Sequence, residues 1–213
     1  MPRQFVGHST TYDNDTREPE PYGTVSQGKI RLPADSLRHI LRAGTSALHH
    51  QLDSAVGEFD SRPSYADYVQ KTHRFRAAIE AGLGSDSEVE WNVDPVADLA
   101  ADDLSDLGVP ALADARFSMS NLTQASRLGA LYVLEGSSLG ARLLLRRAEV
   151  LGLSADFGAR HLARQAADHQ RWRSFLGELE SVPAELQDHA LSAAESVFAF
   201  ALSIYTETVN ECT

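Results

Sequence analysis

Apolar side chains recur at three- and four-residue steps along much of the chain, a spacing that places them on one face of an α-helix. This spacing predicts a first helix that begins at a cap on Asp35 or Ser36 and runs to about residue 59. Its apolar stripe consists of Leu37, Leu41, Thr45, Leu48, Leu52, Val56 and Phe59. One side of this helix is therefore expected to pack on the rest of the protein.

The same spacing predicts helices along the remainder of the chain. They cover residues 64–83, 122–151 and 155–168, continue over 172–180, and end in a helix that opens at Pro183 and almost reaches the C-terminus. Ser120 or Asn121 is the expected cap of the second of these, and Ser154 that of the third. Residues 85–118 are less regular and predict short helices joined by loops. Because no segment alternates apolar and polar residues as a strand does, the expected class is all-α.

Three glycines lie inside the longest predicted helix, although each costs about 1 kcal/mol relative to alanine in a helix interior. Gly129, Gly136 and Gly140 are seven and four residues apart, so all three lie on one face. Two interpretations fit this face. It could pack closely against another helix through small residues, or its backbone could approach a flat, bulky ligand.

Composition restricts the possible partners. Of the 213 residues, 43% are hydrophobic and 23% are charged, as in an ordinary soluble domain. The net charge of −11 argues against nucleic acid as the main partner, because binding to phosphates needs a dominant cationic surface. The single cysteine, Cys212, fits a reducing compartment. Neither a signal peptide nor a membrane-spanning run is evident, so we expect a cytoplasmic protein without membrane attachment.

The N-terminal residues differ from the rest of the chain. Residues 1–30 are polar, contain several prolines and glycines, and carry no sustained apolar period. They are expected to form a flexible or loosely docked arm. The helical domain is expected to cover residues 31–213.

His49 is the histidine whose position is most informative. It follows Thr45 by four residues and precedes Leu52 by three, so it is expected at the half-buried edge of the first helix. A histidine in that position is more often a hydrogen-bonded core residue than a ligand. A neutral imidazole that faces an apolar cleft can nevertheless serve as an axial ligand of haem iron.

Two longer segments carry a family resemblance. Residues 41–53 read LRAGTSALHHQLD, and residues 131–141 read LYVLEGSSLGA. The first resembles the first-helix signature of haem oxygenases, in which a leucine, a basic residue and a threonine precede the proximal histidine. The second resembles the distal helix of bacterial members, especially those associated with bacteriophytochromes. A weaker match over residues 170–180 and the helix after Pro183 extends the resemblance to about residues 36–209.

The resemblance implies a single-domain helical bundle in which haem is sandwiched between the first helix and a glycine-kinked distal helix. His49 would be the axial ligand of the haem iron, and Gly136 and Gly140 would let the distal backbone lie close to the porphyrin. In animal-type members an aspartate follows the first distal glycine and holds a water network. Here that position is Ser137, so the residues that hold the network stay open.

The resemblance also implies contacts at the edge of the haem. Arg173 matches a position where family members place a basic residue against a haem propionate, and Arg42 is a second, weaker candidate. Phe198 would contribute an aromatic contact from the last helix. The alternative for Phe198 is an ordinary core residue.

The activity implied by the resemblance is cleavage of haem to biliverdin, CO and ferrous iron, which consumes O2 and electrons. Haem would be both substrate and prosthetic group. The electrons would come from an external reductase or ferredoxin, and a phytochrome could accept the biliverdin. Two alternatives remain at this point. One is a haem carrier or sensor of the same fold without turnover, and the other is a helical interaction protein in which His49 belongs to the core.

Overall fold

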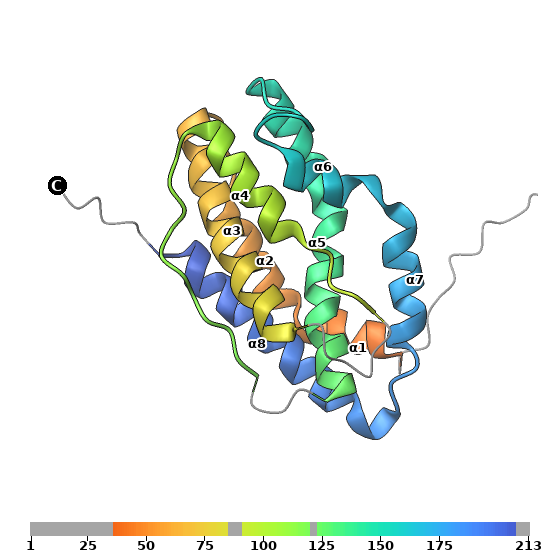
Figure 1. Ribbon diagram of the computed structural model, residues 1–213. Helices are drawn as coiled ribbons and strands as arrows, with labels where there is room; N and C mark the ends of the chain where they lie inside the picture. Colours follow the sequence, from red (N-terminus) through yellow and green to blue (C-terminus); the bar gives the residue numbers. More distant parts are fainter. Residues whose placement is uncertain (1–35, 85–90, 120–122, 208–213) are drawn as a thin grey trace, which may run out of the picture. The chain divides into compact units, whose positions relative to one another are not determined.

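The computed structural model describes residues 36–84, 91–119 and 123–207 (Figure 1). Over these ranges the chain forms eight α-helices and one short 3-10 helix, with no β-strand among the described residues. The all-α prediction is therefore confirmed. The arm expected over residues 1–30 lies outside the described residues.

The first predicted helix is two helices, α1 (Leu37–Gly44) and α2 (Ser46–Val56), with a break at Thr45. Thr45 is buried, and its hydroxyl donates a hydrogen bond to the carbonyl oxygen of Leu41 at 2.7 Å. A threonine that bonds back to the carbonyl four residues earlier commonly bends a helix. The prediction of one continuous helix to Phe59 is therefore wrong.

The next helices are α3 (Arg62–Leu83), α4 (Val96–Leu107) and α5 (Gln124–Val150). The N-cap of α5 is Thr123, whose hydroxyl accepts a hydrogen bond from the Ser126 N–H at 3.2 Å. This cap lies two residues after Asn121 and three after Ser120, the two predicted caps. The helix continues through its glycines without interruption and stops before Gly152, whose φ of +77° is left-handed, as expected for a glycine that ends a helix.

The helix predicted from residue 155 begins later, as α6 (Arg160–Ala167). Ser154 does not cap it but pairs with Phe157 in a tight turn. The cap comes instead from Asp103 of α4, which accepts the N–H groups of Arg160 and His161 at 2.9 and 3.0 Å. Because this cap belongs to a residue 57 positions away, the local sequence around α6 does not reveal where the helix starts.

The C-terminal part consists of α7 (His169–Leu179), the 3-10 helix η1 (Ala184–Leu186) and α8 (Gln187–Tyr205). Helical spacing over residues 172–180 is thus confirmed, although it belongs to a helix separate from α6. Asp168 divides the two, because its carboxylate accepts the N–H groups of Gln170 and Arg171 at 3.1 and 2.9 Å and caps α7.

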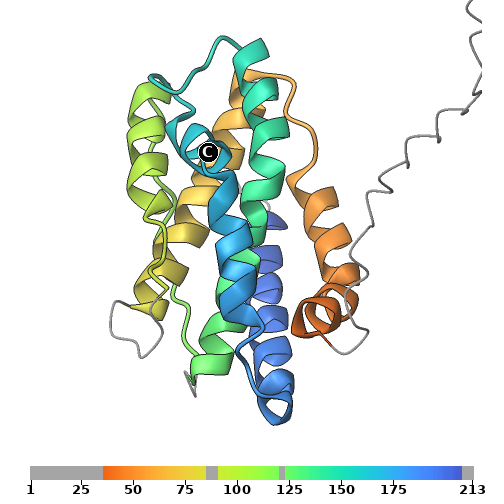
Figure 2. The same ribbon diagram turned by 90° about the vertical axis from the view of Figure 1, so that its right-hand side faces the viewer.

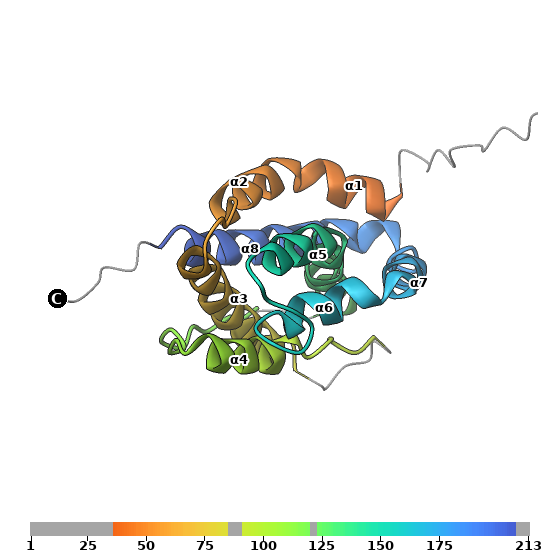
Figure 3. The same ribbon diagram turned by 90° about the horizontal axis from the view of Figure 1, so that it is seen from above.

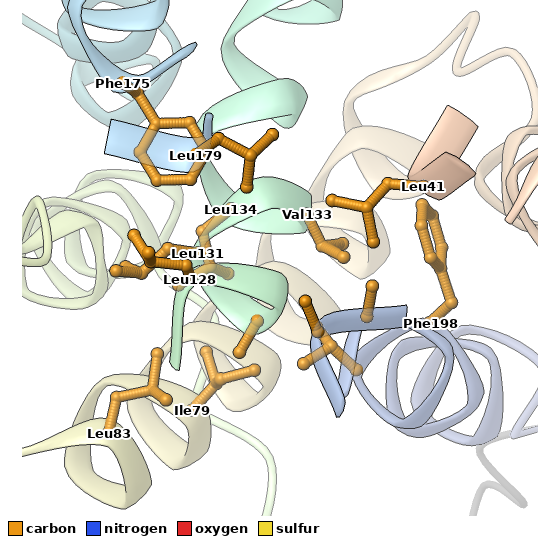
Figure 4. Packing of buried hydrophobic residues seen from close by; sticks show 14 of the residues in the cluster. Leu41, Ile79, Leu83, Leu128, Leu131, Val133, Leu134, Phe175, Leu179 and Phe198 are labelled. Carbon is orange, nitrogen blue, oxygen red and sulfur yellow. The ribbon is translucent and has the colours of Figure 1, made fainter. Parts of the chain in front are cut away.

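Helix α8 joins the two sides of the fold. The helices α1, α2, α3 and α5 all pack against it. Figure 3 shows the α1–α2 pair along one side of α8 and α5 along the other, and Figure 2 shows the pair standing beside α5 from a second direction. The core between α5 and its neighbours is built from leucine, isoleucine, valine and phenylalanine side chains, several of which are labelled in Figure 4.

Helix α5 is the central helix of this core, and its composition reflects that position. By length and a mean hydropathy of 1.2 alone, it is apolar enough to cross a membrane. No membrane-spanning role follows from this, because a core helix passes the same test of length and composition. Burial accounts for part of this composition, since 44% of the apolar window lies inside the fold.

The first of the three glycines in α5 serves helix packing. A Cβ atom at Gly129 would lie 1.9 Å from the carbonyl oxygen of Ala190 in α8. No side chain can occupy that space, so α5 and α8 touch backbone to backbone here. The packing interpretation therefore applies to Gly129.

We expect Gly129→Ala to lower the free energy of unfolding by about 2 kcal/mol, because the clash with backbone outweighs the gain in helix propensity. Gly177→Ala in α7 is the matched control, since a Cβ atom there meets no atom within 4 Å. The control should raise stability by up to about 1 kcal/mol. Urea unfolding followed by circular dichroism measures both changes, and equal effects of the two substitutions would contradict the packing role.

Candidate functional site

The face of α5 that carries the glycines contacts other parts of the protein near its two ends and has free space in the middle. At one end Gly129 touches α8. At the other end Arg147, seven residues after Gly140 and on the same face, donates a hydrogen bond to Glu58 just beyond α2, at 2.9 Å. Between these ends, a Cβ atom at Gly140 would meet no atom within 4 Å. Gly136 and Gly140, which bound the glycine stretch, therefore lie on the face of α5 that is turned toward α1 and α2.

His49 lies on α2, the helix that stands beside α5 in Figure 2. Its side chain is 60% exposed, so the prediction that it is half-buried is wrong. The reason lies in the packing of α2, which rests on α8 and makes no extensive contact with α5 among the described residues. The Phe198 ring packs against the imidazole of His49, and the two ring centroids lie 5.8 Å apart.

Asp53 orients the imidazole of His49. The carboxylate lies one helical turn further along α2, and its Oδ2 atom is 2.9 Å from Nδ1 of His49. When the Nδ1–H group donates a hydrogen bond to this carboxylate, Nε2 keeps its lone pair and becomes the atom that can bind a metal. The arrangement offers one exposed nitrogen ligand with a fixed direction.

Phe198 combines the two roles that the sequence left open. It is 4% exposed and belongs to the main hydrophobic core, where it packs near Leu41 (Figure 4). Its ring also touches the ring of His49. The aromatic side chain that contacts His49 is therefore part of the packed core.

Apolar side chains lie in the open beside the glycine stretch. The described residues expose four large hydrophobic side chains, and two of them, Leu139 and Leu143, are 63% and 54% exposed on α5. They lie four residues apart on one side of Gly140 and so form a continuous apolar strip. Neighbouring exposed apolar side chains on a soluble domain commonly mark a binding surface.

A cationic region lies at the α1 end of the open face. Burial raises the pKa of the Tyr132 phenol, and the positive charges of Arg38 and Arg42 on α1 oppose this shift. Neither arginine pairs with a carboxylate of the described part of the chain. The two arginines of α1 and the phenol of α5 can therefore bind an anionic group together.

Arg173 is exposed on α7, and it too lacks a carboxylate partner among the described residues. Its neighbour Trp172 packs on Tyr132, with ring centroids 5.7 Å apart, and lies 3.9 Å from a Cβ atom built on Gly136. None of the contacts of the described residues joins Arg173 itself to His49 or Arg42. The structure thus brings its helix to the site without bringing its side chain into contact with the other predicted residues.

The hydroxyl groups of the two serines in the glycine stretch donate hydrogen bonds to backbone carbonyls of the same helix. Ser137 donates a hydrogen bond to the Leu134 carbonyl at 2.7 Å, and Ser138 donates to the Glu135 carbonyl at 2.6 Å. The oxygen lone pairs of Ser137, which is exposed, remain available. In this state Ser137 can accept a hydrogen bond from water, while an aspartate at the same position would also carry a charge.

Several residues of the site escaped the sequence analysis. Asp53 was given no role in the sequence analysis, although its spacing of four from His49 is the signal for a helical pair. Tyr132 and the strip next to Gly140 could have been found by projecting α5 on a helical wheel. The participation of Arg38 could be suspected only from its spacing of four to Arg42.

Comparisons with known proteins agree with this geometry. No protein-family model matches the sequence. Heme oxygenase PigA of Pseudomonas aeruginosa is 32% identical over 191 residues, which cover 79% of this chain and 92% of that protein. A heme oxygenase of Xanthomonas campestris is 32% identical over 145 residues, which cover 64% of this chain and 85% of that protein.

A solved structure extends the similarity to the fold. The NO- and CO-bound heme oxygenase of Neisseria meningitidis superposes with a TM-score of 0.66 at 26% identity, over 80% of this chain and 90% of that one. Similarity of sequence and of fold thus covers most of the chain and nearly all of each full-length relative. The chain belongs to the bacterial haem oxygenase family and is an enzyme.

Proposed function

We propose that the protein binds haem between α2 and α5 and cleaves it to biliverdin, CO and ferrous iron. The observation that carries this proposal is the open stretch between Gly136 and Gly140, which lies opposite an exposed and oriented His49. A glycine in a helix is costly and no protein atom near Gly140 requires it. A flat ligand in the open space would explain the glycine, because a residue without a side chain lets the helix backbone approach the surface of the ligand.

The residues of the site fit haem by their chemistry. Nε2 of His49 is the iron ligand, and the carboxylate of Asp53 fixes its direction and raises its basicity. Leu139, Leu143 and Phe198 supply apolar contact to the porphyrin ring. His49 would hold the haem from α2, and the backbone of the glycine stretch would limit the space on the side of α5.

The charged edge of the site fits the propionates. Arg38 and Arg42 of α1, with the Tyr132 hydroxyl, are the partners that the geometry favours for these carboxylates. Arg173 of α7 remains a proposed partner at the neighbouring edge. The ring would then be oriented by charge at one rim and by apolar contact at the other.

When bound, haem supplies the iron that activates O2 and the ring that is cut. The protein contributes position and order. His49 holds the iron from one side, the backbone at Gly136 and Gly140 limits the space on the other, and Ser137 accepts a hydrogen bond from water in that space. The electrons come from an external reductase or ferredoxin in the cytoplasm, and a phytochrome is a proposed acceptor of the biliverdin.

Turnover of added haem tests this proposal. With haem, oxygen and ascorbate or a reductase, the Soret band should disappear and a biliverdin spectrum should replace it, with the product identified by chromatography. His49→Ala should lose the saturable one-to-one complex, because it removes the proposed ligand of the iron. An intact Soret band under efficient reduction would instead favour a haem carrier or sensor.

We expect Gly140→Leu to keep or slightly raise the stability of the ligand-free protein, by up to about 1 kcal/mol, because leucine is the better helix former and has open space. Haem binding or turnover should fall by about tenfold or more, because the side chain fills the space of the ring or of O2. Gly177→Leu on α7 is the control with the same propensity change and equally open space. Loss of function in both variants, or in neither, would contradict the assignment of the distal face.

We expect Arg42→Gln to weaken haem binding by about threefold to tenfold, in the range of a partly exposed ion pair, and Arg38→Gln to act in the same direction. The dimethyl ester of haem, which lacks free propionates, should bind wild type and variants equally. Titrations followed at the Soret band measure both affinities. Arg173→Gln in the same assay decides whether α7 also contributes, and an equal loss of affinity for the ester would show that the arginines act through the fold.

A further inference from the structure

We infer that Glu135 is the positioning residue of the glycine stretch, acting through an ion pair with Arg171 on the side of α5 that faces away from α2. For its effect on catalysis, this inference rests on the proposed function. Its structural part, the anchoring of α5, does not. Glu135 directly precedes Gly136, so the position of its carboxylate affects the backbone of the glycine stretch directly.

The carboxylate of Glu135 is bound on both oxygens. It is 5% exposed, and Arg171 of α7 donates to Oε1 from Nη2 at 2.6 Å and to Oε2 from Nε at 2.9 Å. Trp91 donates its indole N–H to Oε1 at 2.9 Å. Two-point contact between an arginine and a buried carboxylate fixes orientation as well as distance.

The donors of this clamp are themselves held. The guanidinium carbon of Arg171 lies 4.9 Å from the centre of the Trp91 ring, and Nη2 also donates to the carbonyl of Asn92. At the start of α7, the Arg171 N–H is capped by Asp168 at 2.9 Å. The clamp therefore ties α5 to α7 and to the segment before α4, both of which belong to the same packed fold.

The residues that follow Glu135 have no comparable anchor. None of the side chains from Gly136 to Gly140 is buried, and the next buried residue of α5 is Ala141. On one side this stretch faces the open site, where Gly140 touches nothing. The ends of the stretch, at Glu135 and Ala141, therefore determine where its backbone lies.

The opposite side of the stretch offers little apolar packing. A polar cleft lies there between α5, α6, α7 and residues 94–96. Its lining includes Arg76, Asp94, Glu135, Ser138, Arg164 and Arg171. Because charged side chains line this cleft, hydrogen bonds and ion pairs hold this side of α5, and those of Glu135 are among them.

Such an anchor matters for chemistry at the opposite face. A displacement of about 1 Å in a catalytic group can cost about 100-fold in rate, while the binding of the substrate is affected less. The iron ligand His49 belongs to α2, which the clamp does not touch. Loss of the clamp should therefore lower kcat and disturb the distal surroundings of the haem, with little change in haem affinity.

Hydrogen exchange of the ligand-free protein tests the structural part. Glu135→Gln keeps the shape of the side chain and removes its charge. We expect the amides of residues 137–140 to exchange about tenfold faster or more in this variant, because local opening of the stretch becomes easier. Arg164→Gln is the control, because it removes the ion pair with Asp94 in the same cleft, at 2.9 Å, without touching α5. Equal exchange in both variants would overturn the anchoring role.

The haem-bound protein tests the catalytic part, with CO as the probe. In Glu135→Gln, the infrared C–O band should broaden or split and kcat should fall about tenfold, while the haem Kd stays within about threefold of wild type. Arg171→Lys, which keeps the charge, should restore part of the rate relative to Arg171→Gln. An unchanged C–O band and kcat, together with faster exchange, would reduce Glu135 to a purely structural residue.

Two controls keep these outcomes separate. Failure of the wild-type protein to bind haem would refute the proposed function and leave the exchange result standing. If Glu135→Gln does not fold, Trp91→Phe removes one donor of the clamp and keeps the ion pair, and should show the same changes in smaller measure. Wild-type behaviour of a folded Trp91→Phe variant in every assay would then count against the inference.

Discussion

The backbone contact between α5 and α8 at Gly129 is the constraint on which the rest of the structure depends. Because no Cβ atom fits there, the two helices approach more closely than any other residue would allow. From that contact α5 continues along α1 and α2 until Arg147 reaches Glu58 beyond the end of α2. The candidate site is the part of this face of α5 that lies between these two contacts.

The sequence predicted the helices whose pattern is local. The apolar stripe from Leu37 to Val56, the long helix with three glycines and the C-terminal helix all follow from spacing, because each buries one face on a neighbour. The start of α6 did not follow, because Asp103 of α4 provides its cap. The break at Thr45 was also missed, because whether a threonine hydroxyl bends a helix depends on the packing around it.

The site shows the same division between local and distant information. His49, Gly136 and Gly140 were predicted from the sequence because two motifs contain them, but how they lie in space could not be predicted. The spacing of His49 indicated a half-buried edge, and the structure exposes it because α5 stands away from α2. The partners of Glu135 come from two other segments, so nothing in the residues around the glycines pointed to the ion pair behind them.

The exposure of α2 has a thermodynamic consequence. No residue of α2 is fully buried, so this helix depends on its contacts with α8 and adds little to the cooperative core. A ligand that touches both α2 and α5 supplies the missing contact, and linkage makes its binding a contribution to folding, about 4 kcal/mol at a thousand times its Kd. Local opening and proteolysis of α2 then depend on ligand concentration, and the supply of ligand becomes one of the factors that determine how long the protein survives.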